Sequence, residues 1–429
     1  MLAVGVASQA GGVGRGTRAA RVQGSISVAS AVPPKHRIPG GVWALGFVSL
    51  LMDTSSELIH ALLPLYMAGP LGASMLVIGV VEGVAEAIAM IVKVFSGFWS
   101  DRLRHRKPIV LLGYGLAAVS KLAFPLAPTL EWVIGARFAD RIGKGVRGAP
   151  RDALIADLTP PEIRGAAFGL RQALDTVGAI SGPLLAIGAI GYFAGNFHAA
   201  FWIALIPAAL CISVLVLGVH EHDDGRRVTP ASKRISWRDA SRLDRRFWVV
   251  SAIAFVLTLA RFSEAFLVLR GQSVGMGETG APWVMVAMSI VYAAVSYPAG
   301  RAADRGHGGR LLSAGLLALI ASDVVLGLSG SVPGILAGAA LWGLHMALTQ
   351  GLLSALVAAT APPDLRGTAF GVYNLTGGAA MLAASAIAGS LWQAFGPAAT
   401  FLTGASLTLV AWLGFVASGR YVPRLDGHG

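Results

Sequence analysis

The sequence predicts an all-α membrane protein with twelve transmembrane helices, arranged as two parallel repeats of six. Three observations carry this prediction. The chain of 429 residues is 55% hydrophobic and only 13% charged, whereas soluble domains average roughly 25% charged residues. Apolar runs long enough to cross ~30 Å of hydrocarbon recur along its whole length. Motifs of the first half also return in the second half at a nearly constant separation.

The apolar runs define the expected helices one by one. Each contains about 18–25 residues, with Gly and Pro scattered throughout, as membrane helices tolerate. The fourth run differs from the others because it carries many charges. We expect spans at 42–67, 75–99, 109–126, 132–157, 167–190, 199–219, 247–270, 283–302, 311–329, 333–358, 369–391 and 398–418.

Charged residues between the runs predict the orientation of the chain. Basic residues concentrate before the first run, in the even-to-odd loops and above all in the long middle loop, whereas the odd-to-even loops hold almost none. Because cytoplasmic loops of membrane proteins carry the excess of Lys and Arg, we expect both termini and the middle loop in the cytoplasm and the protein in the cell membrane. This placement also accounts for the net charge of +12 without a nucleic-acid partner.

The same pattern divides the chain into five segments. We expect a cytoplasmic tail at 1–40, a six-helix bundle at 41–219, a cytoplasmic linker at 220–246, a second six-helix bundle at 247–418 and a short tail at 419–429. The first segment lacks Asp and Glu and is rich in Gly, Ser, Ala and Arg, which fits a disordered tail, a targeting segment or an over-extended start. The single cysteine excludes an internal disulfide framework.

Two pairs of motifs indicate an internal duplication. TPPEIRGAAFGL (159–170) matches APPDLRGTAFGV (361–372) at a separation of 202 residues, and GFWSDR (97–102) matches GRAADR (300–305) at 203. Offsets that agree this closely indicate a repeat of six spans, and an even number of spans gives both copies the same orientation. Parallel halves of this kind occur in transporters whose halves rock about a central site near the membrane midplane.

At these residues the sequence resembles the major facilitator superfamily, over nearly all of 41–418. GFWSDRLRHRK is similar to its loop signature at Gly97, Asp101 and Arg102, although Arg104 stands where a second Gly is usual. RIGKGVRGA, with Arg141, resembles the fourth-helix motif of the drug:proton antiporters. The resemblance implies the major facilitator fold and favours antiport.

The resemblance also implies a cytoplasmic gate of loop charges. In it Asp101 and Arg102 would join Asp157 in a charge lock that breaks and reforms between the two open states. The second half keeps Gly300, Asp304 and Arg305 but has Thr360 where Asp157 is expected, so a second lock is incomplete. The alternative is that these are ordinary loop charges.

GAISGP (178–183) resembles the Gly-x-x-x-Gly-Pro motif often found in the fifth helix of antiporters. Gly178 and Gly182 fall on one helical face, and Pro183 is expected to distort the helix just after them. This arrangement suits close packing at a moving interface, and it equally suits the small-residue packing common in membrane bundles.

Charged residues inside the spans cluster on helical faces. In the first span, Asp53, Glu57 and His60 are spaced i, i+4, i+7 and share one face. Each such charge costs at least ~2.5–3.5 kcal/mol at the centre of a helix in lipid, so we expect these faces to line a polar cavity in the first half, with pairs such as Glu57–Arg141. The other residues expected there are Glu82, Glu86, Asp140, Arg141, Lys144, Arg171 and Asp175.

These faces predict a secondary active transporter of a small, polar molecule, and the resemblance to drug:proton antiporters implies that it works by alternating access as a proton-coupled efflux antiporter. Glu57 or Asp53 is the expected proton carrier, with Arg141 as the group that returns it to the charged form. His60 could relay a proton, ligate a metal with Asp53 or Glu57, or hydrogen-bond to a neighbouring helix. The membrane lipid, the substrate and protons are the expected partners of a monomer.

Several alternatives stay open at this point. The charges could only hold helices together, or the protein could export a metal ion or chelate, act as a proton-independent facilitator, or serve as a non-transporting sensor. An enzyme is not expected, because the sequence has no Walker loop, Gly-x-Ser-x-Gly elbow, zinc-ligand spacing or dinucleotide fingerprint. No cofactor and no resident metal site are expected.

Overall fold

The computed structural model describes residues 38–100, 102, 105–221, 241–362 and 365–418. Within these ranges all regular elements are helical. The first half contains α1 (Gly40–Ala68), α2 (Met75–Ser100), α3 (Lys107–Lys121), α4 (Leu130–Leu158), the short η1 (Pro161–Ile163), α5 (Arg164–Tyr192) and α6 (Phe197–Gly218). The second half contains α8 (Arg245–Ala260), α9 (Ala265–Ser273), α10 (Gly277–Gly280), α11 (Trp283–Ala302), η2 (Ala303–His307), α12 (Gly308–Leu328), α13 (Val332–Thr360), α14 (Arg366–Phe395) and α15 (Pro397–Ala417).

Some sequence predictions fall outside these residues. They are nearly all of the tail predicted at 1–40, the gate residue Asp101, most of the linker predicted at 220–246 and the tail at 419–429. Most residues of the duplicated motifs lie within the described chain, with Asp101, Pro363 and Asp364 outside it. The motifs at 159–170 and 361–372 each lead into a long helix, α5 beginning at Arg164 and α14 at Arg366.

Nine helical stretches of the described chain are long and apolar enough to cross a membrane, and one of them, Gly277–Leu328, contains both α11 and α12. The protein is therefore an all-helical, multi-pass membrane protein. Counting Gly277–Leu328 as two spans gives ten in the described chain. The predicted count of twelve is reached when α3 and α4 are also taken as spans. The helix α3 has only 15 residues and ends before the predicted 109–126 span does. Pro125 accounts for the early end, because a proline has no N–H to bond the carbonyl four residues earlier, that of Lys121, and its ring clashes with that carbonyl in a continuing helix.

The predicted seventh helix, 247–270, is broken in the structure. It ends as α8 at Ala260 and restarts as α9 at Ala265. Ser263 satisfies the exposed backbone of the break: its N–H donates to the Ser385 hydroxyl at 3.2 Å, and its own hydroxyl accepts from the Ala265 N–H at 3.3 Å. Irregular backbone at membrane depth is tolerated where protein groups satisfy it in this way. The predicted seventh span is therefore one apolar stretch, Arg245–Ser273, built from two helices.

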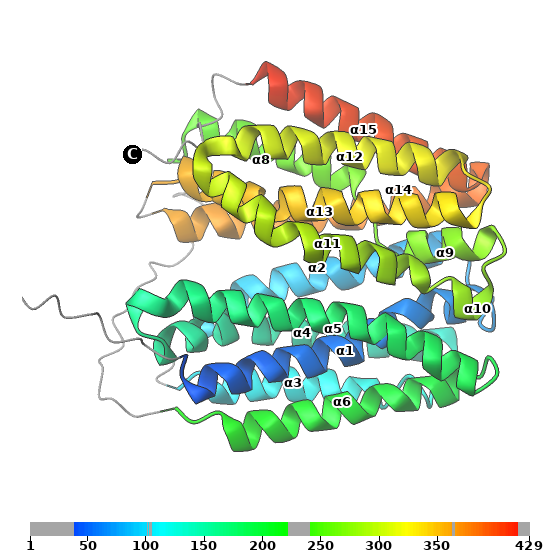
Figure 1. Ribbon diagram of the computed structural model, residues 1–429, viewed down its shortest axis with the longest axis horizontal. Helices are drawn as coiled ribbons and strands as arrows, with labels where there is room; N and C mark the ends of the chain where they lie inside the picture. The colour runs from blue at the N-terminus through cyan, green and yellow to red at the C-terminus, as the bar shows by residue number, and fades with distance from the viewer. Residues whose placement is uncertain (1–37, 101, 103–104, 222–240, 363–364, 419–429) are drawn as a thin grey trace, which may run out of the picture. The chain divides into compact units, whose positions relative to one another are not determined.

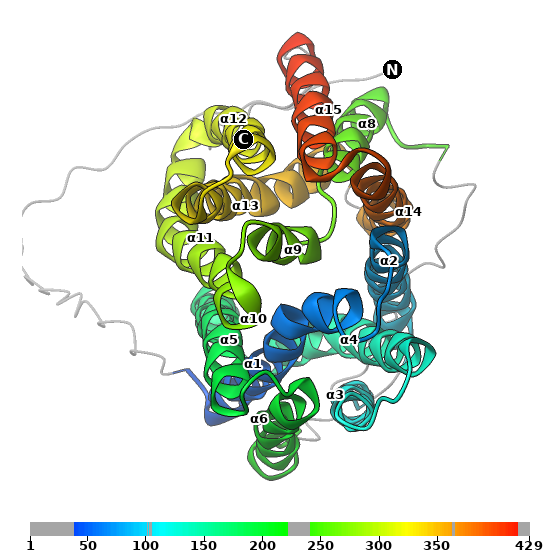
Figure 2. The same ribbon diagram turned by 90° about the vertical axis from the view of Figure 1, so that its right-hand side faces the viewer.

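The two halves meet along two pairs of helices, α2 with α14 and α5 with α11 (Figure 2). Glycines make the first of these contacts close. A Cβ at Gly83 would stand 2.9 Å from the Cα of Leu382, and one at Gly389 would stand 2.9 Å from the Cα of Leu76. Backbones therefore touch directly across the interface, as small residues permit in membrane bundles.

The end at which α1 and α8 begin is called the linker end, and the opposite end, where α9 finishes, is the far end (Figure 1). At the far end the last ten residues before Ala68 in α1 are buried, as are the first seven of α9. Both segments belong to a single apolar core that includes residues of both halves. A separate core, with Val48 and Tyr114 among its members, lies towards the linker end and contains first-half residues only. Apolar packing therefore joins α1 to α9 at the far end.

Candidate functional site

A cavity of about 260 Å³ lies between the two halves. The first half contributes one wall, formed by Glu57, His60, Glu86, Met90, Arg141 and Lys144. The second half contributes the other wall, formed by Arg261, Phe262, Ser263, Glu264, Trp342, Gln350 and Met381. The break between α8 and α9 thus supplies four consecutive lining residues, which is how discontinuous helices build sites in other transporters.

His60 of α1 lies between two carboxylates. Its Nδ1 is 3.5 Å from Oε2 of Glu57, one turn earlier on the same helix, and its Nε2 is 3.6 Å from Oε2 of Glu82 on α2. Glu82 is fully buried and also accepts a 2.6 Å hydrogen bond from Arg137 of α4. These four side chains form a continuous charged chain from the cavity wall into the first half.

Arg141 binds a different carboxylate from the one that the helical faces suggested. Its Nη1 lies 3.1 Å from Oε1 of Glu86, and both side chains line the cavity. Glu57 has His60 as its ion-pair partner instead. The expected Glu57–Arg141 pair is therefore wrong for this conformation. Helical periodicity gives the face of each residue but not its depth or its rotamer, and those decide the partner.

Asp53, Arg171 and Asp175 do not line this cavity. They belong to a second cluster nearer the linker end, where Asp53 lies 3.6 Å from Arg147. Arg171 of α5 lies 2.9 Å from Asp175 and 3.6 Å from Asp152 of α4. The prediction of a single shared polar cavity is corrected: the charges of the first half divide among separate clusters.

Asp140 faces away from the cavity. Its Oδ1 accepts a 2.6 Å hydrogen bond from Lys121 of α3, and both side chains are buried. Asp140 was expected on the cavity face because the charged residues of the fourth span share an arc of about 140°, but an arc that wide faces more than one neighbouring helix. Lys121 lies inside the predicted span 109–126, so a charge within an apolar run was the sequence signal of this pair.

The helix-packing glycines lie directly against the charged face of α1. A Cβ at Gly178 would stand 2.8 Å from the Leu50 carbonyl oxygen, and one at Gly182 would stand 2.5 Å from the Cβ of Glu57. Pro183 follows inside α5, which continues to Tyr192. These glycines therefore set how close α5 approaches α1 at the height of the cavity.

The described residues of the expected gate lie at the linker end. Asp157 is 3.0 Å from Nε of Arg106, and the Arg102 guanidinium stacks 3.8 Å above the Phe98 ring. A Cβ at Gly97 would stand 3.3 Å from the Cβ of Ala149, so α2 and α4 are close there. Arg106 is thus a partner of Asp157 that the motif did not suggest.

The corresponding segment of the second half is shaped differently. Asp304 and Arg305 lie in the wider turn η2, which contains Gly306 with φ +84°. Gly300 has open space where a Cβ would stand. The close helix approach found at Gly97 is therefore not repeated at Gly300, although the sequence motif is.

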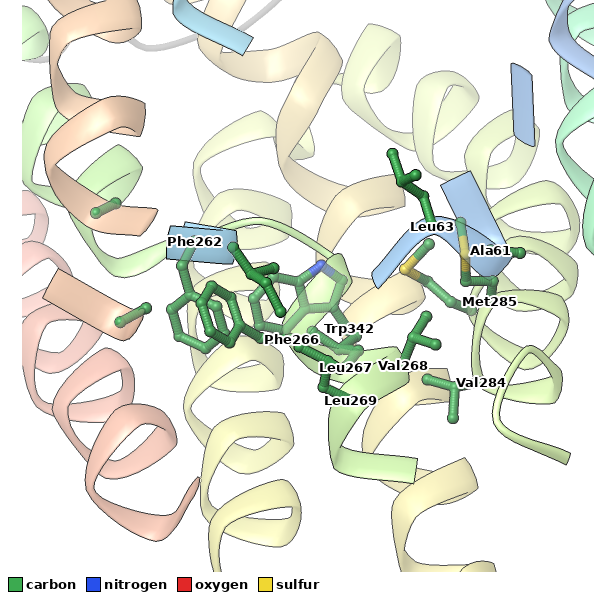
Figure 3. Packing of buried hydrophobic residues seen from close by; sticks show 14 of the residues in the cluster. Ala61, Leu63, Phe262, Phe266, Leu267, Val268, Leu269, Val284, Met285 and Trp342 are labelled. Carbon is green, nitrogen blue, oxygen red and sulfur yellow. The ribbon is translucent and has the colours of Figure 1, made fainter. Parts of the chain in front are cut away.

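Sequence reasoning gave too little weight to the second half. Arg261 and Glu264 were visible as charges inside a span, yet the coupling chemistry was expected in the first half. Phe262 and Trp342 were not singled out, because aromatic residues are common in apolar spans; their ring centroids lie 5.5 Å apart (Figure 3). The recognisable signal was the polar tetrapeptide RFSE in the middle of an apolar run.

Within the part of the chain that the structure describes, no group of three or more His, Cys, Asp and Glu side chains could hold a metal ion. Asp323 of α12 is fully buried, and both of its carboxyl oxygens lack a hydrogen-bond partner among the described residues. The ring of His345 of α13 has one hydrogen bond to a described residue, with the Gly315 carbonyl at 2.9 Å from Nδ1.

A helical membrane protein with a polar cavity between two repeated halves has the architecture of a transporter. Comparison with known proteins identifies the family. The family model described as Major Facilitator Superfamily matches residues 45–270 and 250–426. The chain belongs to this superfamily of transporters.

Individual relatives agree with this assignment. The chain is 33% identical over 381 residues to an uncharacterized MFS-type transporter of Methanocaldococcus jannaschii, covering 87% of this chain and 93% of the relative. It is 25% identical to the multidrug resistance protein MdtH of Photorhabdus laumondii, covering 78% of this chain and 82% of the relative. Among solved structures, a POT family transporter in complex with 5-aminolevulinic acid matches with a TM-score of 0.74 at 15% identity, covering 90% of this chain and 97% of that one. The last likeness concerns the fold alone.

Proposed function

We propose that this protein is a proton-coupled antiporter that exports a small polar molecule by alternating access. The observation that carries the proposal is the position of the Glu57–His60 pair, which lines a cavity between the two halves and continues to Glu82. A cavity that opens to each side in turn exposes such a pair to two proton concentrations. The pair can then take up a proton on one side and release it on the other.

Glu57, rather than Asp53, is the proposed proton carrier. Both lie on the same face of α1, but only Glu57 lines the cavity. Burial favours the neutral form of a carboxyl, and nearby cations favour the charged form. Rearrangement of the halves around Glu57 would change the balance between these effects. Arg141, held by Glu86 at 3.1 Å, is close enough in the same cavity wall to take part.

The conformation of the protein supports export as the direction of transport. Because apolar packing joins α1 to α9 at the far end, a route into the cavity from the linker end is the one to expect in this state. With the linker end in the cytoplasm, as loop charge predicts, this is the state in which an exporter would load. The name of the MdtH relative, a multidrug resistance protein, also favours export.

Vesicles containing the purified protein and an internal pH dye test the proposal. Candidate compounds are added while proton flux is recorded for wild type, Glu57→Gln and Glu131→Gln. Glu131 is the matched control, because it loses the same charge at an exposed position outside the cavity. Compound-triggered flux that vanishes only in Glu57→Gln supports antiport.

Two other results would change the assignment. Substrate movement without proton flux, unchanged in Glu57→Gln, would make the protein a proton-independent facilitator. Flux that requires a metal ion and is lost in His60→Asn would favour the metal-export alternative.

A further inference from the structure

We infer that the transported molecule carries an anionic group and that Arg261, at the break between α8 and α9, binds that group. The inference rests on the proposed function, because it takes the cavity between the halves to be the transport site. It deepens that function by naming the class of substrate: a small organic anion with an apolar body.

Arg261 is a cation without a partner in a polar cavity. A guanidinium has five N–H donors, yet its side chain makes no hydrogen bond or ion pair with any residue that the structure describes, and its Nε is buried and unpartnered. Glu264 lies three residues further along the chain, across the break, but the two side chains are not within ion-pair distance.

Buried arginines elsewhere in the described chain do have partners for their guanidinium groups. In the first half, Arg137 and Arg141 each have a carboxylate within 3.1 Å, although the Nε atom of each is unpartnered, as it is in Arg261. In the second half, Arg270 donates to the carbonyls of Leu326 and Ser329, both at 2.8 Å. Arg261 is half-buried. Withdrawing a charge from water without a partner is costly, and a substrate anion would lower that cost.

The chemistry around Arg261 defines the rest of the ligand. The planar guanidinium fork matches carboxylate and phosphate groups, which it can bind with two parallel hydrogen bonds. Phe262 and Trp342 lie beside it, with ring centroids 5.5 Å apart, and offer an apolar surface for the body of the ligand. A cavity of about 260 Å³ accommodates a small molecule.

Binding of matched carboxylates and carboxamides to the purified full-length protein tests the inference. The probes are benzoate, phenylacetate and indole-3-acetate, each compared with its own amide at constant ionic strength and pH. A charge-assisted hydrogen bond strengthens binding by roughly tenfold to a hundredfold, so wild type should prefer the carboxylate by at least that lower factor. Arg261→Gln should lose the preference, and Arg261→Lys should keep part of it.

Two controls separate recognition from structure. Arg301→Gln removes the same charge outside the cavity, where Arg301 contacts the Tyr297 ring, and should keep the full preference. Because Arg261 has no partner to lose, Arg261→Gln should also unfold at no lower temperature than wild type. A clear drop in that temperature would show that Arg261 serves the fold and would overturn the inference.

Other results would overturn it as well. Wild type could bind none of the carboxylates, or bind the amides equally well. The preference for carboxylates could survive in Arg261→Gln, or it could be lost in Lys144→Gln instead. Binding needs no proton movement, so a carboxylate preference in a wild type that shows no compound-triggered proton flux would sink only the antiport proposal. Compound-triggered proton flux with uncharged compounds alone would sink only the anion inference.

Discussion

Gly182 of α5 lies directly against Glu57 of α1. A Cβ at this glycine would stand 2.5 Å from the Cβ of Glu57 and 2.8 Å from the Thr54 carbonyl oxygen. The helix motif that resembles an antiporter signature therefore borders the carboxylate proposed to carry the proton. Any side chain at this position must separate the two helices at the site itself.

We predict that Gly182→Ala destabilises the protein by roughly 1–3 kcal/mol, the usual range for overpacking, and reduces transport. The backbone atoms of α1 that surround the site cannot move aside. Gly188→Ala is the control on the same helix, because a Cβ there meets nothing within 4 Å. Replacing Gly by Ala at such a position should stabilise the helix slightly. Thermal unfolding followed by tryptophan fluorescence compares the two variants, and equal stability would contradict the packing described.

A second prediction concerns the buried pair Lys121–Asp140. Removing one partner leaves the other charge buried and unpaired, which costs ~3–5 kcal/mol. We therefore expect Lys121→Met and Asp140→Asn each to lower the unfolding temperature strongly. The double variant should recover much of the loss, because neither charge then remains. Losses that simply add in the double variant would show that the two side chains do not interact.

Asp323 should behave in the opposite way. Its carboxyl oxygens have no partner among the described residues, so Asp323→Asn removes a potential charge without breaking a contact. We expect this variant to unfold at the wild-type temperature or above it, whereas Asp140→Asn, the same chemical change, is destabilising. A large loss of stability in Asp323→Asn would reveal a partner that this conformation does not contain.

The predicted orientation can be tested with single cysteines. Cys211 is buried, and Cys211→Ser provides the background. Glu278→Cys places a thiol in α10 at the far end, and Arg310→Cys places one near the start of α12 at the linker end. Since loop charge places the linker end in the cytoplasm, a membrane-impermeant maleimide should label the first variant in intact cells and the second only after lysis. The reverse pattern would invert the assigned topology and, with it, the loading side.

Sequence patterns predicted different features with different success. The span at 283–302 coincides with α11, because an uninterrupted apolar run bounded by polar residues leaves little choice of boundary. The seventh span could not be predicted as two helices. Its break contains neither Gly nor Pro, and the Ser385 and Glu82 side chains that contact Ser263 come from α14 and α2.

The charged residues likewise differ in what the sequence could predict and what only helix packing decided. Their spacing along α1 placed Glu57 and His60 on one face, and in the structure both line the cavity. Spacing could not decide that Arg141 binds Glu86 or that Asp140 turns towards Lys121. Those pairings depend on which helix packs against which, and at what depth.

By itself, the sequence determined the class of this protein. Apolar runs of membrane-spanning length and a duplicated motif are properties of the chain that hold whatever the helices pack against, because lipid requires each span to satisfy its own backbone. Only the tertiary structure decided where the site lies. The cavity exists because the break between α8 and α9 in the second half faces the charged helix α1 of the first half. The hydrophobic periodicity of a helix does not determine its distance from another helix. The sequence therefore shows that Arg261 is a charge inside a span. Only the structure shows that no residue of the described chain forms a hydrogen bond or ion pair with its side chain.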